Sequence, residues 1–89
     1  MGILEDINWL KSNADGWGKI FEIVAGSRTI SIPEIKEKYG GEDWWPVKSY
    51  ITILKARGLV AEENGLISLT EQGKKVHETM KTIEEVATV

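Results

Sequence analysis

Residues 51–73, with the sequence ITILKARGLVAEENGLISLTEQG, decide the fold. They continue a helix whose apolar side chains recur every three or four residues, and Gly58 permits the left-handed backbone that commonly ends such a helix. Asn64-Gly65 is the strongest short signal for a hairpin turn, so the flanking residues 59–62 and 66–69 are predicted to pair as strands. Thr70 then caps a last helix, which is predicted from about residue 71 to 87.

Upstream of this stretch the sequence predicts three helices, with a brief extended segment at 28–31. The first runs from about residue 3 to 12, and the second begins after Asp15, a candidate N-cap, and ends at Gly26. The third opens with the capping box Ser31-Ile32-Pro33-Glu34 and ends at Gly40. No internal repeat interrupts this order.

The helix predicted over about 46–58 has two different faces. Apolar side chains fall on one face, which is expected to be buried: Val47, Tyr50, Ile51 and Leu54. The opposite face and its flanks carry polar, small and basic side chains: Lys48, Ser49, Thr52, Ile53 and Ala56, with Lys55 and Arg57 at the flanks. At about 1.5 Å per residue the helix is roughly 20 Å long, enough to lie in a major groove.

This order of elements resembles a winged helix-turn-helix domain. The resemblance lies in two segments, Ile51-x-x-Leu54-x-x-Arg57-Gly58-Leu59-Val60 and Leu69-Thr70-Glu71-Gln72-Gly73. Their spacing is similar to that of small bacterial and archaeal regulators, including the multiple-antibiotic-resistance group. It implies a mainly α fold with a small β-hairpin (α+β), namely a three-helix core with a wing and extension helices at both ends. The expected organisation is one domain over 1–89, with an N-terminal helix in 1–14, the core in 15–70 and the C-terminal helix in 71–89.

The resemblance implies that the predicted helix 46–58 binds double-stranded DNA. Lys48, Ser49 and Thr52 would then face base edges, while Lys55 and Arg57 would meet phosphates. Trp45, just ahead of this helix, is a further candidate contact, although it and Trp44 could equally fill the core. The alternative for the basic residues is that they only keep a surface helix solvated.

The charge distribution supports two different hypotheses. The formal charge is −3, yet residues 44–61 hold three basic residues and no acidic one, whereas residues 1–45 hold eight acids against five bases. This favours DNA at the helix and a small transcriptional regulator. The expected wing, however, carries Glu62 and Glu63, which phosphate would repel. A winged-helix module that binds a protein instead of DNA is therefore the alternative.

A homodimer is the second partner that the sequence predicts. The last helix has an apolar stripe at coiled-coil-like spacing, part of which must cover the chain's own core. The rest, with the first helix, could pair with a second copy, and the predicted dimerisation residues are Val76, Met80, Ile83, Ala87 and Ile7.

Composition excludes several other classes. The chain has no Cys and a single His, so thiolate or all-histidine metal sites and cysteine nucleophiles are absent. His77 is expected to be a flanking surface residue, and the scattered carboxylates define no catalytic cleft. We therefore expect no enzyme, no cofactor and no metal. No apolar run approaches the roughly 18 residues of a membrane span, and the predicted location is the cytoplasm.

Overall fold

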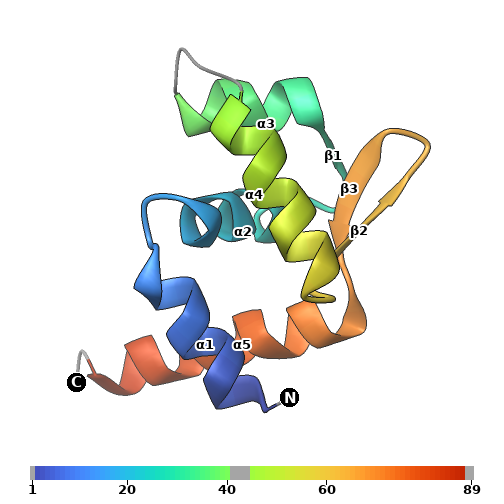
Figure 1. Ribbon diagram of the computed structural model, residues 1–89. Coiled ribbons are helices and arrows are strands. Elements are labelled where there is room, and N and C mark those ends of the chain that lie inside the picture. The colour runs from blue at the N-terminus through green and yellow to red at the C-terminus, as the bar shows by residue number, and fades with distance from the viewer. Residues whose placement is uncertain (1, 41–44, 88–89) are drawn as a thin grey trace.

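The computed structural model describes residues 2–40 and 45–87. In the described residues, five helices pack around a core with a small sheet at its side (Figure 1). Two strands of this sheet form a hairpin that projects from the body of the molecule. In chain order the elements are α1 (Ile3–Ser12), α2 (Trp17–Ala25), β1 (Ile30–Ser31), α3 (Ile32–Tyr39), α4 (Trp45–Ala56), β2 (Val60–Glu63), β3 (Leu66–Leu69) and α5 (Glu71–Ala87). The mainly α, α+β fold is confirmed.

Helix α3 begins and ends as its sequence predicts. The Ser31 hydroxyl accepts a hydrogen bond from the Glu34 N–H at 3.3 Å and donates one to Glu34 Oε1 at 2.9 Å. Gly40 ends the helix in the left-handed region, with φ of 81°. The prediction that Asp15 caps α2 is wrong, because Gly16 occupies the N-cap and the structure shows no side-chain cap there.

The sheet has the order β1-β3-β2 and is antiparallel throughout. Asn64 and Gly65 both have positive φ, 54° and 79°, which is the backbone of a two-residue turn between paired strands. The hairpin is therefore confirmed. The remaining strand of the sheet is β1. The sequence predicts it only as an extended segment, and in the structure its Ile30 pairs with Ile67 of β3.

Helix α4 ends in a Schellman motif that directs the chain into the wing. The Gly58 N–H bonds to the Lys55 carbonyl at 3.0 Å, and the Leu59 N–H reaches back to the Leu54 carbonyl at 3.1 Å. Gly58 has φ of 82°, and both leucines are fully buried. The helix thus ends at Ala56, two residues before the predicted boundary, because Arg57 and Gly58 form the cap.

The start of α5 interlocks with this turn. The Thr70 hydroxyl accepts from the Gly73 N–H at 3.0 Å and donates to the Gly58 carbonyl at 2.6 Å, so one side chain joins the helix cap to the wing. The Thr70 N–H also binds the Leu59 carbonyl oxygen at 3.1 Å. Gly73 packs directly against that same carbonyl, where a Cβ atom would not fit. The Leu-Thr-x-x-Gly spacing therefore reflects a close backbone approach.

The core takes side chains from all five helices and all three strands. Its members are Ile7, Leu10, Ile20, Phe21, Val24, Ile30, Ile35, Val47, Ile51, Leu54, Leu59, Val60, Ile67, Val76 and Met80. Helix α4 is thereby held by its inner face and leaves the opposite face to solvent. No helix in the described residues is both long and apolar enough to cross a membrane.

Candidate nucleic-acid interface

The outer face of α4 gathers three of the predicted DNA-binding residues. Lys48, Ser49 and Thr52 line a shallow hollow together with Ile53, and of these only Ser49 is half-buried. The Thr52 hydroxyl donates to the Lys48 carbonyl at 3.0 Å, which leaves its oxygen able to accept from an outside donor. Val47, Ile51 and Leu54 fix the opposite side of the same helix in the core, so this face has a defined orientation.

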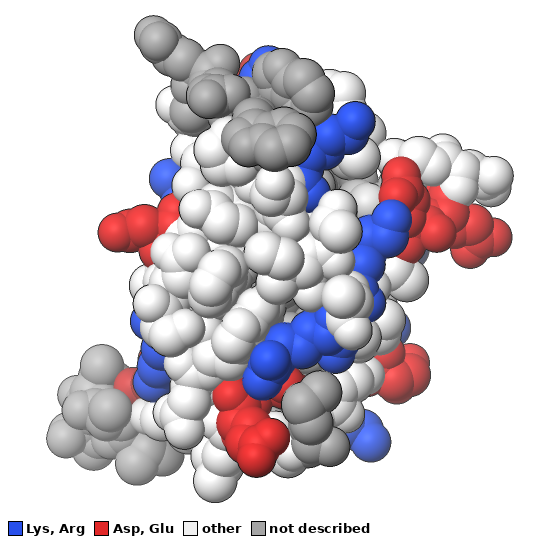
Figure 2. Space-filling model, viewed as in Figure 1, with Lys and Arg blue, Asp and Glu red and all other residues white. Residues whose placement is uncertain are grey.

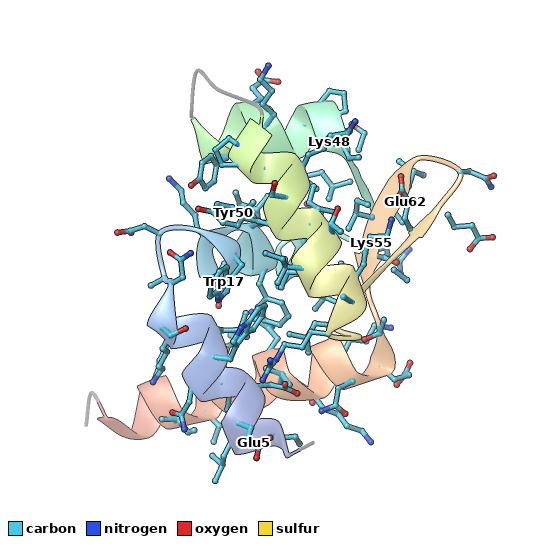
Figure 3. The ribbon with its side chains drawn as sticks, viewed as in Figure 1. Glu5, Trp17, Lys48, Tyr50, Lys55 and Glu62 are labelled. Atoms are coloured by element: carbon cyan, nitrogen blue, oxygen red, sulfur yellow. The ribbon has the colours of Figure 1, made fainter. Side chains whose placement is uncertain are left out.

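The structure sends Lys55 toward the wing. Its Nζ lies 2.7 Å from Glu62 Oε1 of β2, and the two side chains point toward each other across the gap between α4 and the hairpin (Figure 3). Lys48 points elsewhere, away from the wing's base. Figure 2 shows blue and red side chains in contact where α4 faces the hairpin, while other basic side chains on this face lie away from the hairpin.

Arg57 lies apart from the other predicted contacts. Its Nε donates to Asp6 Oδ1 of α1 at 2.9 Å, and its guanidinium stands over the Trp9 ring, 4.4 Å from the centroid. Asp6 is 3% exposed and also accepts from Gln72 Nε2 at 3.3 Å. A phosphate contact by Arg57 stays a prediction, but its side chain already joins α1 to the end of α4.

Trp45 begins α4, and its side chain lies outside the described part of the chain, as does Trp44 altogether. Their predicted contact with DNA or with the core therefore stays a prediction.

The wing, which consists of β2, β3 and the turn between them, carries negative charge and no positive charge. Residues 58–73 contain no Lys or Arg, and the exposed strand end and turn are Glu62, Glu63, Asn64 and Gly65. Because a phosphate backbone repels carboxylates, the charge of the wing disfavours it as a contact with nucleic acid, and a contact through α4 stays a prediction.

Sequence reasoning missed an aromatic cluster beside α4. The rings of Trp9 and Trp17 are stacked 4.8 Å apart, and Tyr50 meets Trp17 edge-on at 5.9 Å. The Trp17 Nε1–H donates to the Trp9 carbonyl at 2.9 Å. The position of Trp9 next to buried Leu10 is a weak signal, because it places the ring only at the border of the apolar face of α1.

Tyr39 is the last residue of α3, and it contacts the start of α2 and the residues just before that helix. Its hydroxyl donates to the Asp15 carbonyl at 2.8 Å, and Lys19 stands over its ring at 5.0 Å. Burial raises the pKa of the Tyr39 phenol, and the neighbouring Tyr50 and Asp15 raise it further. A phenol is already protonated at neutral pH, and the raised pKa keeps the Tyr39 hydroxyl a hydrogen-bond donor into more alkaline solution.

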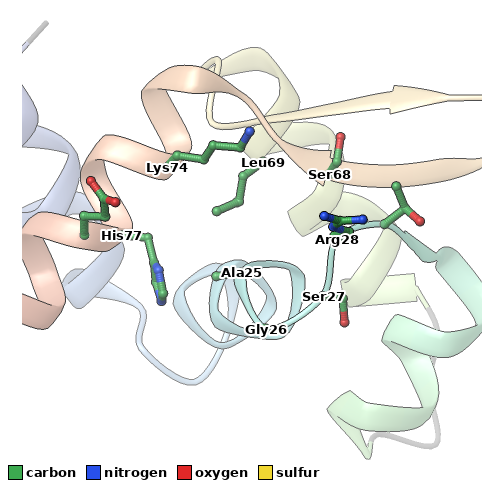
Figure 4. A pocket seen from close by; sticks show the side chains of 10 residues that line it. Ala25, Gly26, Ser27, Arg28, Ser68, Leu69, Lys74 and His77 are labelled. Atoms are coloured by element: carbon green, nitrogen blue, oxygen red, sulfur yellow. The ribbon is translucent and has the colours of Figure 1, made fainter.

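A second hollow lies between the end of α2, β3 and α5, with none of its lining residues in α4 (Figure 4). Its charged lining residues are Arg28, Lys74 and Glu78, and the imidazole of His77 lies beside them. His77 Nε2 lies 3.5 Å from Glu22 Oε2, and its ring packs edge-on to Phe21. His77 is thus half-buried, closer to the core than the surface position that its sequence predicts. No group of three or more potential metal ligands occurs in residues 2–40 and 45–87.

The predicted dimerisation surface is corrected in part. Ile7 is 3% exposed, Val76 is fully buried and Met80 is 9% exposed, so these side chains already complete the chain's own core. Ile83 is 37% exposed and could meet a second copy. The Ala87 side chain lies outside the described residues.

Two adjoining helices, α3 and α4, followed by a β-hairpin and a covering helix, define a winged helix-turn-helix protein. A family model described as winged helix-turn-helix matches residues 43–88, which is 46 of the 89 residues, and the chain belongs to this family. The family is of a non-catalytic type, and membership indicates DNA binding in general. The match does not show whether the chain is related to the multiple-antibiotic-resistance group in particular. No curated protein and no solved structure matches the chain.

Proposed function

We propose that this chain, as one winged-helix domain over residues 1–89, binds double-stranded DNA sequence-specifically and regulates transcription. The observation that carries the proposal is the solvent-facing hollow of α4 lined by Lys48, Ser49 and Thr52. Lysine donates to the guanine acceptors of the major groove, and hydroxyls donate to or accept from either base pair. With a length of about 18 Å, α4 spans the reading surface of a few base pairs.

Charge makes the proposed binding selective. The chain is acidic as a whole, and its wing adds carboxylates next to α4, so sequence-independent attraction to phosphate is weak. Base contacts must then supply a larger share of the binding free energy. This supports a regulator that acts at preferred sites over a protein that coats DNA.

We further propose that the regulator acts in the cytoplasm as a homodimer. One short recognition helix reads few base pairs, and two copies on half-sites a helical turn apart multiply affinity and specificity. Among the described side chains of α5 and α1, the exposed large apolar ones are Ile83, at 37%, and Leu4, at 66%. Sedimentation of the free protein measures the mass directly, and a monomer at high concentration would overturn this part.

Lys48→Glu tests the DNA interface. We expect the dissociation constant for a duplex selected from a random pool to rise about tenfold to a hundredfold, because a groove donor becomes a repelled carboxylate. Fluorescence anisotropy at increasing salt measures it, and wild-type affinity should fall steeply as salt rises. Lys81→Glu is the matched control. Lys81 is an exposed residue of α5, and its replacement changes the net charge by the same amount.

Equal losses in the Lys48 and Lys81 variants would show that only total charge matters and would remove α4 from the interface. Absence of wild-type binding at low salt would overturn the proposed function. Recovery of a stable protein partner would then favour the second candidate, a protein-binding winged helix, for which the acidic wing is the supporting observation.

A further inference from the structure

An ion pair between two side chains of this chain, Lys55 and Glu62, joins α4 to the wing. Lys55 Nζ and Glu62 Oε1 are 2.7 Å apart, with side chains 41% and 30% exposed. Because both groups reach water, the pair can open without leaving a buried charge. Lys55 lies on the flank of the proposed reading face, where a DNA backbone would pass.

Strand alternation decides which wing carboxylate reaches the helix. Glu62 is paired with Ile67, whose side chain is fully buried against the helices, so Glu62 lies on the helix side of the hairpin. Glu63 is paired with Leu66, which is 40% exposed, and therefore lies on the opposite side. Two adjacent residues of equal charge thus have different access to Lys55.

A carboxylate and a phosphate compete for the same ammonium group. Lysine acts as a compact point charge with rotatable donors, so it can exchange one oxygen ligand for another without a fixed geometry. On DNA, Lys55 must leave Glu62 before it can meet phosphate. Sequence-independent binding depends on such phosphate contacts and loses one of them whenever the pair stays closed.

We propose that Glu62 is an intramolecular substitute for DNA phosphate, which occupies Lys55 and lowers sequence-independent binding. This inference rests on the proposed function and assigns the acidic wing a role within it. The wing acts on the helix and has no need to touch DNA.

Glu62→Gln and Glu63→Gln, compared on a short duplex of mixed sequence, test the inference. Both variants remove one negative charge, so general repulsion falls equally in each. Only Glu62→Gln frees Lys55, and we expect it to bind roughly twofold to fivefold more tightly than Glu63→Gln at low salt, because an exposed ion pair is worth at most about 1 kcal/mol. The plot of log affinity against log salt should also steepen by about 0.9, the value for one added phosphate contact.

The Lys55→Gln background provides the decisive control. There, the two glutamine variants should bind alike, because no ammonium remains to be released. Circular dichroism checks that each variant is folded, and Glu62→Ala repeats the test with a different side chain.

If all variants bind DNA and Glu62→Gln equals Glu63→Gln, the inference is overturned while the proposed function stands. If wild type and every variant fail to bind at low salt, the proposed function is wrong and the inference falls with it. A Glu62 effect that persists in the Lys55→Gln background would also overturn it.

Discussion

Replacing Gly73 by alanine is expected to lower the free energy of unfolding by about 3 kcal/mol. The new Cβ would collide with the Leu59 carbonyl oxygen and lie 3.2 Å from the Leu59 carbonyl carbon and 3.4 Å from the Leu69 Cβ. Backbone atoms cannot move aside as the end of a flexible side chain can. The clash would push α5 away from the turn that joins α4 to β2. It would also weaken the hydrogen bonds that the Thr70 hydroxyl makes with Gly58 and Gly73. Urea unfolding followed by circular dichroism measures the loss.

Helix propensity alone makes the opposite prediction for this site, since alanine is favoured over glycine in a helix by about 1 kcal/mol. The sign of the change therefore distinguishes close packing from local preference. Gly2→Ala is the control, because no atom lies within 4 Å of the position that its new Cβ would take, and a change within about 0.5 kcal/mol is expected. A stabilised Gly73→Ala variant would contradict the packing described at Leu59.

Arg57→Ala is expected to cost a similar amount, about 3 kcal/mol. It removes the charged partner of Asp6, a carboxylate that is 3% exposed and whose other donor in the described part of the chain is the Gln72 amide. It also removes the cation that stands over Trp9. The free energy of unfolding at neutral pH, again from urea titration, measures the effect.

A second substitution isolates the unpaired charge. Asp6→Asn added to Arg57→Ala should restore part of the lost stability, because the buried anion is then gone. If the double variant is no more stable than Arg57→Ala, the cost arises from lost packing of the arginine and not from Asp6. The same proteins test the predicted phosphate contact of Arg57: a loss of DNA affinity beyond that explained by unfolding would support it.

The sequence predicts the local parts of this fold well. Ser31 and Thr70 begin helices, Gly40 and Gly58 end them, and Asn64-Gly65 closes the hairpin, because each signal acts over a few residues. The outer face of α4 follows from helical periodicity in the same way.

Contacts between distant segments carry no such signal. Asp6 and Arg57 are 51 residues apart in sequence, and an acid on a short amphipathic helix looks like a solvated residue until α1 is placed over the end of α4. The pairing of β1 with β3 and the capture of Lys55 by Glu62 likewise depend on how elements meet. Spacing finds candidate residues, but their partners come from the tertiary arrangement.

The predicted dimer surface shows the same limit from the apolar side. An apolar stripe predicts that one face of a helix is buried, but it does not predict whether that face packs against the same chain or against another molecule. In this chain Val76 and Ile7 lie within the core itself, and Ile83 is the member of the α5 stripe that the described side chains leave exposed to another molecule.

The stacked pair of Trp9 and Trp17 gives the molecule an optical property of its own. Two indole rings held 4.8 Å apart with planes 5° from parallel are close enough for their electronic transitions to couple, so we expect the pair to contribute a circular dichroism signal that a lone indole does not. One ring belongs to α1 and the other to α2, so this signal is expected to be lost when the N-terminal helix leaves its place against α2. The protein thus carries a built-in spectroscopic probe of its own first helix.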